Sequence, residues 1–311
     1  MLITSISAKT PLVNCVRESI EQYGIEVHII GADSNPHAIA RYFIDDFWHM
    51  PYLNDLTIEE LLQYCHTKQI DIIIPTREAE LLFFARHKST LGRHGIHVMV
   101  SDEPSLNTVQ DKLLFYEFLR AKGYPFIQTS PTIDDINAER YVVKERYGAG
   151  SANLILNVTK SAATERSQHL NNPIFQPYIN GTEYSIDVYV DRKGIAKGAI
   201  VRERVVVIGG ESHVTKTLRH KKLEQTAMSL AEELQLQGHI MFQVIADPTD
   251  NYHIVECNPR FGGASTLSIR AGLDSFYWFL LEAQGKDITN VPFKRSKQEL
   301  TQVRYKKDLI L

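Results

Sequence analysis

Residues 255–263, Val-Glu-Cys-Asn-Pro-Arg-Phe-Gly-Gly, decide the fold of this chain, together with Met-Phe-Gln-Val-Ile-Ala at 241–246. Residues 241–246 and 252–256 are predicted strands, because both runs are mainly apolar and rich in residues common in sheets. Between them, Asp-Pro-Thr-Asp-Asn at 247–251 consists of residue types that form turns. We therefore expect the two strands to form a β-hairpin.

The register of this hairpin decides which side chains meet across it. We expect Asp247 to pair with Tyr252 next to the turn. Gln243 then lies directly opposite Glu256 on the neighbouring strand. An amide oxygen and a carboxylate would thus converge at one place on the hairpin.

Three polar residues follow one face of the second strand. Because side chains alternate between the faces of a strand, Glu256 and Asn258 share a face, and Arg260 follows at the same spacing. Hard oxygen ligands suit Mg²⁺, which shares its coordination shell with water and substrate phosphates. An arginine beside them suits a phosphoryl group in transfer. The pattern favours an ATP–Mg²⁺ site over the alternative, a surface ion pair between Arg260 and Glu256 in a polar loop.

The composition is that of an ordinary globular protein. A length of 311 residues suggests about two domains, and the net charge of −3 gives no reason to expect a nucleic-acid partner. The three cysteines lie far apart and form no CxxC pair, which argues against a disulfide framework or a zinc site. We see neither a signal peptide nor an apolar run of about 20 residues that could span a membrane, so a cytoplasmic location is expected.

The first hundred residues alternate between predicted strands and helices. The expected strands are 2–7, 27–31, 71–75 and 97–100, and the expected helices are 12–23, 57–68 and 78–87. Apolar strands separated by helices predict a doubly wound parallel sheet. The first strand is followed by Ser-Ile-Ser-Ala-Lys at 5–9 and not by G-x-G-x-x-G, which argues against a dinucleotide site.

A change of organisation is expected near residue 106. Residues 101–105, Ser-Asp-Glu-Pro-Ser, have the composition of a domain boundary, and 107–122 is a predicted helix that ends at Gly123. The later part mixes short strands, Gly-rich loops and helices. We therefore expect an α/β domain over residues 1–106 and an α+β domain over residues 107–311.

A second candidate anion site follows a predicted strand at 141–144. This strand ends in Lys144, and Tyr-Gly-Ala-Gly-Ser-Ala follows at 147–152. Glycines allow backbone N–H groups to surround an anion, and the preceding lysine can reach phosphates. The spacing differs from the P-loop motif G-x-x-x-x-G-K-[ST], so this is another kind of phosphate cradle. Taken alone, such a segment is more often a simple turn.

Residues 172–187 are expected to form a strand, a short connector and a second strand. A connector between two lobes can present backbone groups to an adenine edge. The carboxylate of Glu183, a few residues further on, can accept hydrogen bonds from ribose hydroxyls. The alternative is a hairpin with a solvated glutamate.

The order of these segments resembles the ATP-grasp superfamily across nearly the whole chain, and it is most similar to the carbamoyl-phosphate-synthase-like branch. The matching elements are Asp111-Lys112 opening a helix, Val143-Lys144, Gly148-Ala149-Gly150-Ser151, Gly181-Thr182-Glu183-Tyr184, Gln243, and Glu256-x-Asn258-Pro259-Arg260. The resemblance implies a pre-ATP-grasp domain over residues 1–106. It also implies a two-lobed ATP-grasp domain over 107–311, with a small lid lobe at 113–178 and a larger lobe at 179–311.

The resemblance also implies the residues that bind ATP. From phosphates and covering loop to adenine and ribose, they are Lys112, Lys144, Gly148, Gly150, Ser151, Gln176, Tyr178 and Glu183. Gln176 and Tyr178 would contact adenine through the backbone or the side chain. The role of Lys112 depends entirely on the resemblance, because the alternative is an exposed helix lysine.

The metal ligands and catalytic residues follow in the same way. Gln243, Glu256 and Asn258 would bind one or two Mg²⁺ ions, with Mn²⁺ as a substitute. Arg260 and Lys144 would stabilise the transferred phosphoryl group. Arg202 and Arg204 share strand parity and would hold an acyl phosphate or a substrate carboxylate, although a solvated charged strand is an equal alternative.

The chain departs from the resemblance at two points. Carbamoyl phosphate synthase large chains contain two ATP units, whereas this chain has room for one, so it cannot by itself perform the two-phosphorylation synthesis. The Pro-Thr-x-Asp-x-Glu-Leu pattern of relatives appears at residues 75–81 with Glu78 in place of aspartate, which leaves the role of Glu78 open. Cys257 is expected to face the core, on the other side of the strand from Glu256.

The implied activity is that of a carboxylate–amine ligase. ATP would phosphorylate a small-molecule carboxylate, and an amine would attack the acyl phosphate and release phosphate. The alternatives are phosphorylation of bicarbonate or carbamate, and a non-catalytic ATP-binding subunit that acts through a partner. Similar proteins are often dimers, which makes a homodimer the implied assembly.

Overall fold

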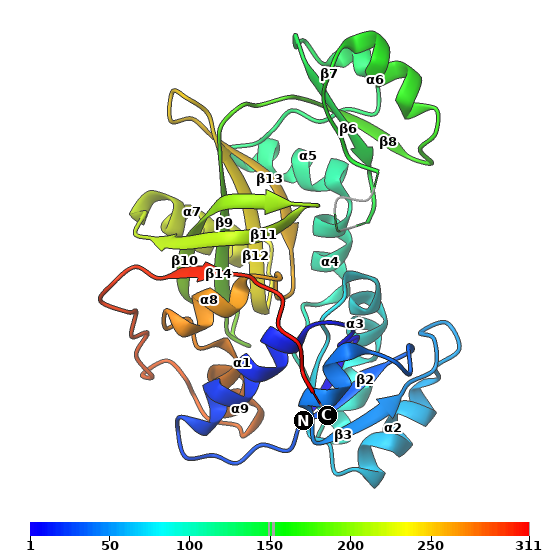
Figure 1. Ribbon diagram of the computed structural model, residues 1–311, viewed down its shortest axis with the longest axis vertical. Coiled ribbons are helices and arrows are strands. Elements are labelled where there is room, and N and C mark those ends of the chain that lie inside the picture. The colour runs from blue at the N-terminus through cyan, green and yellow to red at the C-terminus, as the bar shows by residue number, and fades with distance from the viewer. Residues whose placement is uncertain (149, 151–152, 311) are drawn as a thin grey trace.

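The computed structural model describes residues 1–148, 150 and 153–310. Ser151, which we assigned to the phosphate loop, lies outside the described residues. The described residues form sheets of five, six and three strands. Figure 1 shows the N-terminal sheet at the lower right, the six-stranded sheet at the centre left and the three-stranded sheet at the top.

The N-terminal sheet is parallel, with the strand order β3-β2-β1-β4-β5. Its elements are β1 (Leu2–Thr4), α1 (Thr10–Glu21), β2 (Ile30–Asp33), the 3-10 helix η1 (Ile39–Phe43), β3 (Asp46–His49), α2 (Ile58–Thr67), β4 (Ile72–Ile74), α3 (Glu78–Arg93) and β5 (His97–Val98). Thr57 caps α2 by accepting a hydrogen bond from the Glu60 N–H, as its position before the predicted helix indicated. The predicted doubly wound parallel sheet is confirmed.

The single helix predicted over residues 107–122 is wrong, because the chain forms two helices there, α4 (Glu103–Gln110) and α5 (Lys112–Lys122). Asp111 separates them in an extended conformation, and its carboxylate accepts hydrogen bonds from the N–H groups of Leu113 and Leu114. This N-cap is a local side-chain contact that a helical period does not reveal. Gly123 ends α5 in the left-handed conformation, as expected. The domain boundary that we predict at residue 106 falls within α4.

The three-stranded sheet is antiparallel, with the order β7-β6-β8. Its strands are β6 (Tyr141–Glu145), β7 (Ile155–Val158) and β8 (Pro173–Pro177), and η2 (Ile133–Asp135) and α6 (Lys160–Ser167) accompany them. The predicted strand that ends near Lys144 is β6.

The six-stranded sheet is antiparallel and has the order β13-β12-β9-β10-β11-β14. Its elements are β9 (Thr182–Val190), β10 (Ala196–Ile208), β11 (Glu211–Leu218), α7 (Lys221–Glu233), β12 (Gly238–Ala246), β13 (Tyr252–Asn258), α8 (Ser265–Arg270), α9 (Ser275–Ala283) and β14 (Thr301–Val303). None of the helices in the described part of the chain combines the length and apolarity needed to cross a membrane.

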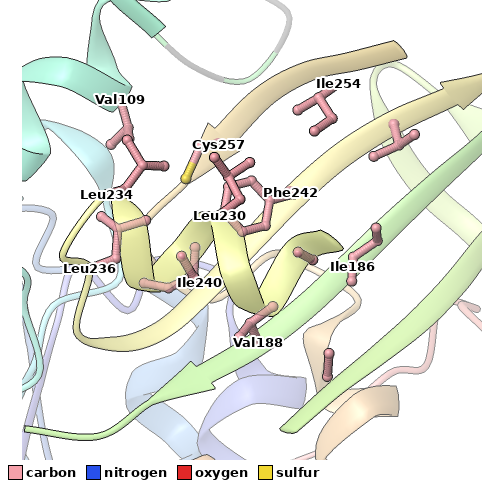
Figure 2. Packing of buried hydrophobic residues seen from close by; sticks show 14 of the residues in the cluster. Val109, Ile186, Val188, Leu230, Leu234, Leu236, Ile240, Phe242, Ile254 and Cys257 are labelled. Atoms are coloured by element: carbon pink, nitrogen blue, oxygen red, sulfur yellow. The ribbon is translucent and has the colours of Figure 1, made fainter. Parts of the chain in front are cut away.

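The core of this larger lobe lies between α7 and one face of the six-stranded sheet. Figure 2 shows Val188, Phe242 and Cys257 from three strands packed with Leu230 from α7. Cys257 is only 5% exposed, so the expectation that it faces the core is confirmed. Because side chains alternate along a strand, burying one face of the sheet sends the polar residues between them to the opposite face.

The hairpin register differs from the prediction by one residue at the turn. Ala246, not Asp247, pairs with Tyr252, yet Gln243 still pairs with Glu256. The pairing shifts by one residue between Gln243 and Val244, because Val255 of β13 has no partner on β12. This β-bulge explains why the two pairs follow different registers. The functional pairing was therefore predicted correctly from a register that is wrong near the turn.

Candidate functional site

One row of side chains crosses the polar face of the six-stranded sheet. Strand pairing aligns, from β13 to β10, Glu256, Gln243, Ser185 and Arg202. The next row aligns Asn258, Met241 and Asp187. The predicted metal ligands Gln243, Glu256 and Asn258 therefore come together on the face opposite α7.

The oxygen donors on this face suit a hard cation. No group of three or more His, Cys, Asp or Glu side chains in the described part of the chain could hold a metal ion. The predicted set instead combines one carboxylate, Glu256, with the amides of Gln243 and Asn258. Such a sparse set fits Mg²⁺, which usually completes its shell with water and substrate phosphates.

Arg260 connects this set to the N-terminal domain. The Asn258 side-chain amide donates to Glu256 Oε1 at 2.9 Å and accepts from Arg260 Nη2 at 3.1 Å. The same Nη2 atom lies 3.8 Å from Glu78 Oε2, at the start of α3. Burial raises the pKa of Glu78 above its usual range, and Arg260 acts in the opposite direction. The sequence left Glu78 without a role, and the structure places it beside the predicted phosphoryl-binding arginine.

Two lysines outside the six-stranded sheet are predicted to act beside the predicted metal ligands. Lys144 on β6 is 7% exposed, and its burial lowers its pKa to about 8, although Glu256 acts to raise it. Lys112 at the start of α5 donates to the carbonyl oxygen of Gly148 at 2.7 Å. Lys112 also acts to lower the pKa of Lys144. Like charges gathered in this way suit a polyanionic ligand such as a nucleotide phosphate chain.

Replacing Lys144 with Met is expected to stabilise the ligand-free protein at pH 7 by about 1–3 kcal/mol, because it removes a buried charge. The folded pKa, about 8, lies below the ordinary 10.5, so the native state binds fewer protons than the unfolded state between these values. Wild-type stability therefore rises with pH across that interval, and the gain from Lys144→Met should vanish above it. Urea unfolding of wild type and Lys144→Met at pH 7 and pH 10.5 measures the gain in stability and its loss at high pH. Lys160→Met, at an exposed lysine of the same lobe, is the control, and equal gains at both pH values would contradict the prediction.

The phosphate loop is described in part. Gly148 and Gly150 have φ values of 101° and 74°, which favour glycine over residues with a side chain. Upstream, Arg146 forms two hydrogen bonds to Asp111, at 2.8 and 2.6 Å, and Tyr147 donates to the same carboxylate at 3.0 Å. This Asp111 clamp fastens the loop to the start of α5, and our sequence reasoning missed it. The adjacent Asp111-Lys112 pair was its only sequence signal.

The predicted adenine and ribose residues lie along β8 and β9. Gln176 is 2% exposed, and its side-chain amide nitrogen already donates to Thr129 Oγ1 at 2.8 Å. The Tyr178 N–H donates to the carbonyl oxygen of Arg140 at 2.9 Å. Glu183 Oε2 accepts from Arg204 Nη1 at 2.7 Å, so the predicted ribose ligand and one predicted catalytic arginine form an ion pair. The roles of these residues stay predictions.

Arg202 is neither solvated nor on an exposed strand. It is 1% exposed, and its Nε atom donates to Asp187 at 2.7 Å and to Ser268 at 3.0 Å. Asp187 also accepts from Ser265 at 2.6 Å and Ser268 at 2.5 Å. His239 Nε2 lies 3.1 Å from it. Burial alone would raise the pKa of Asp187, but Arg202 and His239 hold it well below its usual range.

Asp187 also reaches the loop that follows Arg260. The Gly262 N–H donates to Ser265 Oγ at 2.8 Å, and Ser265 Oγ donates in turn to Asp187. A single buried carboxylate thus orients Arg202 and fixes the loop beyond Arg260. No sequence motif signals this hub, because its members are far apart along the chain.

Two family models match the chain. Residues 169–307 match the model described as "ATP-grasp in the biosynthetic pathway with Ter operon", and residues 1–99 match the model "PylC-like, N-terminal domain". These matches confirm the ATP-grasp resemblance of the sequence and the presence of a distinct N-terminal domain type.

A curated relative is the carbamoyl phosphate synthase large chain of Methanobrevibacter smithii, which is 23% identical over 281 residues. The match covers 82% of this chain and 26% of that protein, so this chain spans about a quarter of the relative's length.

Solved structures share the fold. The biotin carboxylase domain dimer of the Hydrogenobacter thermophilus 2-oxoglutarate carboxylase, solved with MgADP, ADP and bicarbonate, superposes with a TM-score of 0.76 at 16% identity. The match covers 97% of this chain and 74% of that one. The N5-carboxyaminoimidazole synthetase of Staphylococcus aureus complexed with ADP gives a TM-score of 0.71 at 17% identity, over 93% of this chain and 78% of that one.

Proposed function

Because residues 1–99 match a PylC-like N-terminal domain model and residues 169–307 match an ATP-grasp model, we propose that this chain is an ADP-forming ligase that joins a small-molecule carboxylate to an amine. The observation that supports this most is that a carboxylate of the six-stranded sheet and an ammonium group of the three-stranded sheet influence each other. Glu256, Gln243 and Asn258 lie on the polar face of one sheet. The buried ammonium of Lys144 approaches from the other sheet, close enough for Glu256 to act on its pKa.

Each residue has a role in this proposal. Lys112 and Lys144 bind the phosphates of ATP, and Gly148 and Gly150 contribute backbone N–H groups beside them. Gln243, Glu256 and Asn258 hold Mg²⁺, which when bound neutralises phosphate charge and leaves the γ-phosphoryl group open to attack. Arg260 binds the phosphoryl group as it reaches the substrate carboxylate. Arg204 holds the acyl phosphate from the β10 side, whereas Arg202 is buried against Asp187 beneath this face. This chemistry is mostly positioning and electrostatic stabilisation, so it needs no protein nucleophile.

ADP release from Mg·ATP tests the proposal. We expect release only when a carboxylic acid and an amine are both supplied, and splitting the pools of acids and amines identifies the pair. Calorimetry with Mg·ATP alone should show binding without turnover. ADP release at the same rate with and without the organic acid would count against a ligase, and so would the absence of Mg·ATP binding.

Bicarbonate is the second candidate acceptor. The biotin carboxylase domain named above was solved with bicarbonate beside MgADP, and its fold is shared over 97% of this chain. In that case ADP release requires bicarbonate and needs no organic acid. Assays in CO₂-depleted buffer, with and without added bicarbonate, separate the two candidates.

A further inference from the structure

The proposed catalysis assigns no role to the loops after β1 and β4, which are joined by hydrogen bonds. The strand order β3-β2-β1-β4-β5 places these two strands side by side, at the point where the chain changes direction across the sheet. In open parallel sheets, ligands bind beyond the carboxyl ends of the strands at such a point. The loop after β4 contains Glu78, which approaches Arg260. The loop after β4 therefore lies next to the predicted phosphoryl-binding arginine.

The two loops hold each other in a fixed shape. Thr76 Oγ1 donates to the carbonyl oxygens of Thr4 and Ser5 at 2.7 and 3.0 Å. Ser5 Oγ donates to Glu80 at 2.8 Å. Ser5 and Ser7 have φ values of 50° and 41°, a conformation that costs energy for residues other than glycine. Such strained and cross-linked loops are typical of binding sites, where rigidity reduces the entropy lost when a ligand binds.

Lys9, which follows the loop after β1, has no acidic partner among the described residues. Its Nζ atom donates to the carbonyl oxygen of Ser5 at 2.6 Å, and no carboxylate oxygen of the described residues lies within 4.0 Å of it. Burial lowers its pKa. Arg260 and Arg77 also act to lower this pKa, whereas Glu80 and Asp33 act to raise it. Arg77 directly follows Thr76, whose side chain joins the two loops.

The neighbouring carboxylates are already engaged by neutral donors. Glu80 accepts hydrogen bonds from the backbone N–H groups of Thr76 and Arg77, at 2.6 and 2.8 Å, and from Ser5. Asp33 accepts from the N–H groups of Ser7 and Asn35, at 2.7 and 2.9 Å. Both acids build the loops, and the ammonium of Lys9 keeps donors for a ligand.

We propose that the acid substrate carries a second anionic group, a carboxylate or a phosphate, which Lys9 and Arg77 bind while Arg260 faces the carboxylate to be phosphorylated. This inference rests on the proposed ligase function and adds the class of its substrate. A monocarboxylic acid would leave Lys9 half-buried with only a carbonyl partner. A second anion would instead give it a charge-assisted hydrogen bond, which is stronger than one to a neutral acceptor.

Hydroxylamine makes the test independent of the unknown amine. Its nitrogen attacks the acyl phosphate, so a C–N bond forms, the acyl C–O bond to phosphate breaks, and a hydroxamate and phosphate result. Wild-type protein is incubated with Mg·ATP, hydroxylamine and one of three pools, namely monocarboxylic acids, di- and tricarboxylic acids, and phosphorylated carboxylic acids. The last two pools distinguish a carboxylate from a phosphate as the second anion.

We expect hydroxamate from a pool of acids with a second anion, at least about tenfold above the monocarboxylic pool. Lys9→Gln should raise KM for that acid about 10–100-fold, with kcat within about twofold and KM for ATP unchanged. Lys68→Gln, at an exposed lysine that pairs with Asp46 on the same domain, should change none of these.

Three outcomes would overturn the inference, and they separate it from the proposed function. Equal or greater hydroxamate from monocarboxylic acids overturns it and leaves the ligase function standing. An unchanged KM in Lys9→Gln does the same. No hydroxamate from any pool refutes the ligase function, and the inference fails with it.

Discussion

Glu256→Gln is expected to lower the rate of ADP release about a thousandfold while the protein stays folded. Glu256 is the one carboxylate among the predicted metal ligands, and it accepts a hydrogen bond from the Asn258 side-chain amide at 2.9 Å. Removing its charge withdraws several kcal/mol of stabilisation from a Mg²⁺–phosphate complex, and each 1.36 kcal/mol corresponds to a tenfold change in rate. The readouts are ADP release with the acid and amine identified above, and Mg·ATP affinity by calorimetry.

Glu203→Gln is the matched control for this substitution. Glu203 lies on β10 in the same sheet, where its neighbour Arg202 faces the site, so Glu203 faces away from it. Glu203→Gln should leave activity unchanged, and the circular dichroism spectra of both variants should match that of the wild type. Wild-type turnover in Glu256→Gln would remove this carboxylate from the metal set.

Asp187→Ala is expected to destabilise the protein by about 3–5 kcal/mol, the largest loss of stability that we predict for a single polar residue. Arg202 is 1% exposed, and Asp187 is the carboxylate that neutralises it. Removing Asp187 leaves this charge buried without a counter-ion, and it frees Ser265 and Ser268 from their acceptor. Urea unfolding followed by tryptophan fluorescence measures the change.

The double variant Asp187→Leu, Arg202→Met separates charge from packing. It removes both members of the ion pair, so it should recover most of the stability lost in Asp187→Ala while activity stays low. A double variant as unstable as Asp187→Ala would show that the hydrogen-bond hub, and not the unpaired charge, dominates.

The contribution of Asp187 also has a defined pH dependence. Its pKa in the folded protein lies below the ordinary value of about 3.9. The stabilisation is therefore complete above about pH 4 and is lost as the pH falls toward the folded pKa. The difference in stability between wild type and Asp187→Ala should shrink only at strongly acidic pH.

Much of the candidate site could be predicted because it is encoded locally. Alternation along β13 alone places Glu256 and Asn258 on one face and Cys257 in the core. The strand that ends near Lys144 and the glycines that follow are contiguous in the sequence. Other features needed the structure even though they are close in sequence. Asp111 divides the predicted helix in two by capping α5 with its side chain. A bulge at Val255 shifts the pairing of the hairpin by one residue.

The sequence by itself determined the alternation of strands and helices, the hairpin, and the residue types of the ATP–Mg²⁺ set. These features depend on side-chain periodicity and on hydrogen bonds between near neighbours, which a linear pattern records. Only the tertiary structure decided that Glu78 meets Arg260, that Asp187 neutralises Arg202, and that Lys9 stays without an acidic partner among the described residues. Ion pairs and buried charges depend on which distant segments pack together. The periodicity of the sequence does not specify the distance in space between two such side chains.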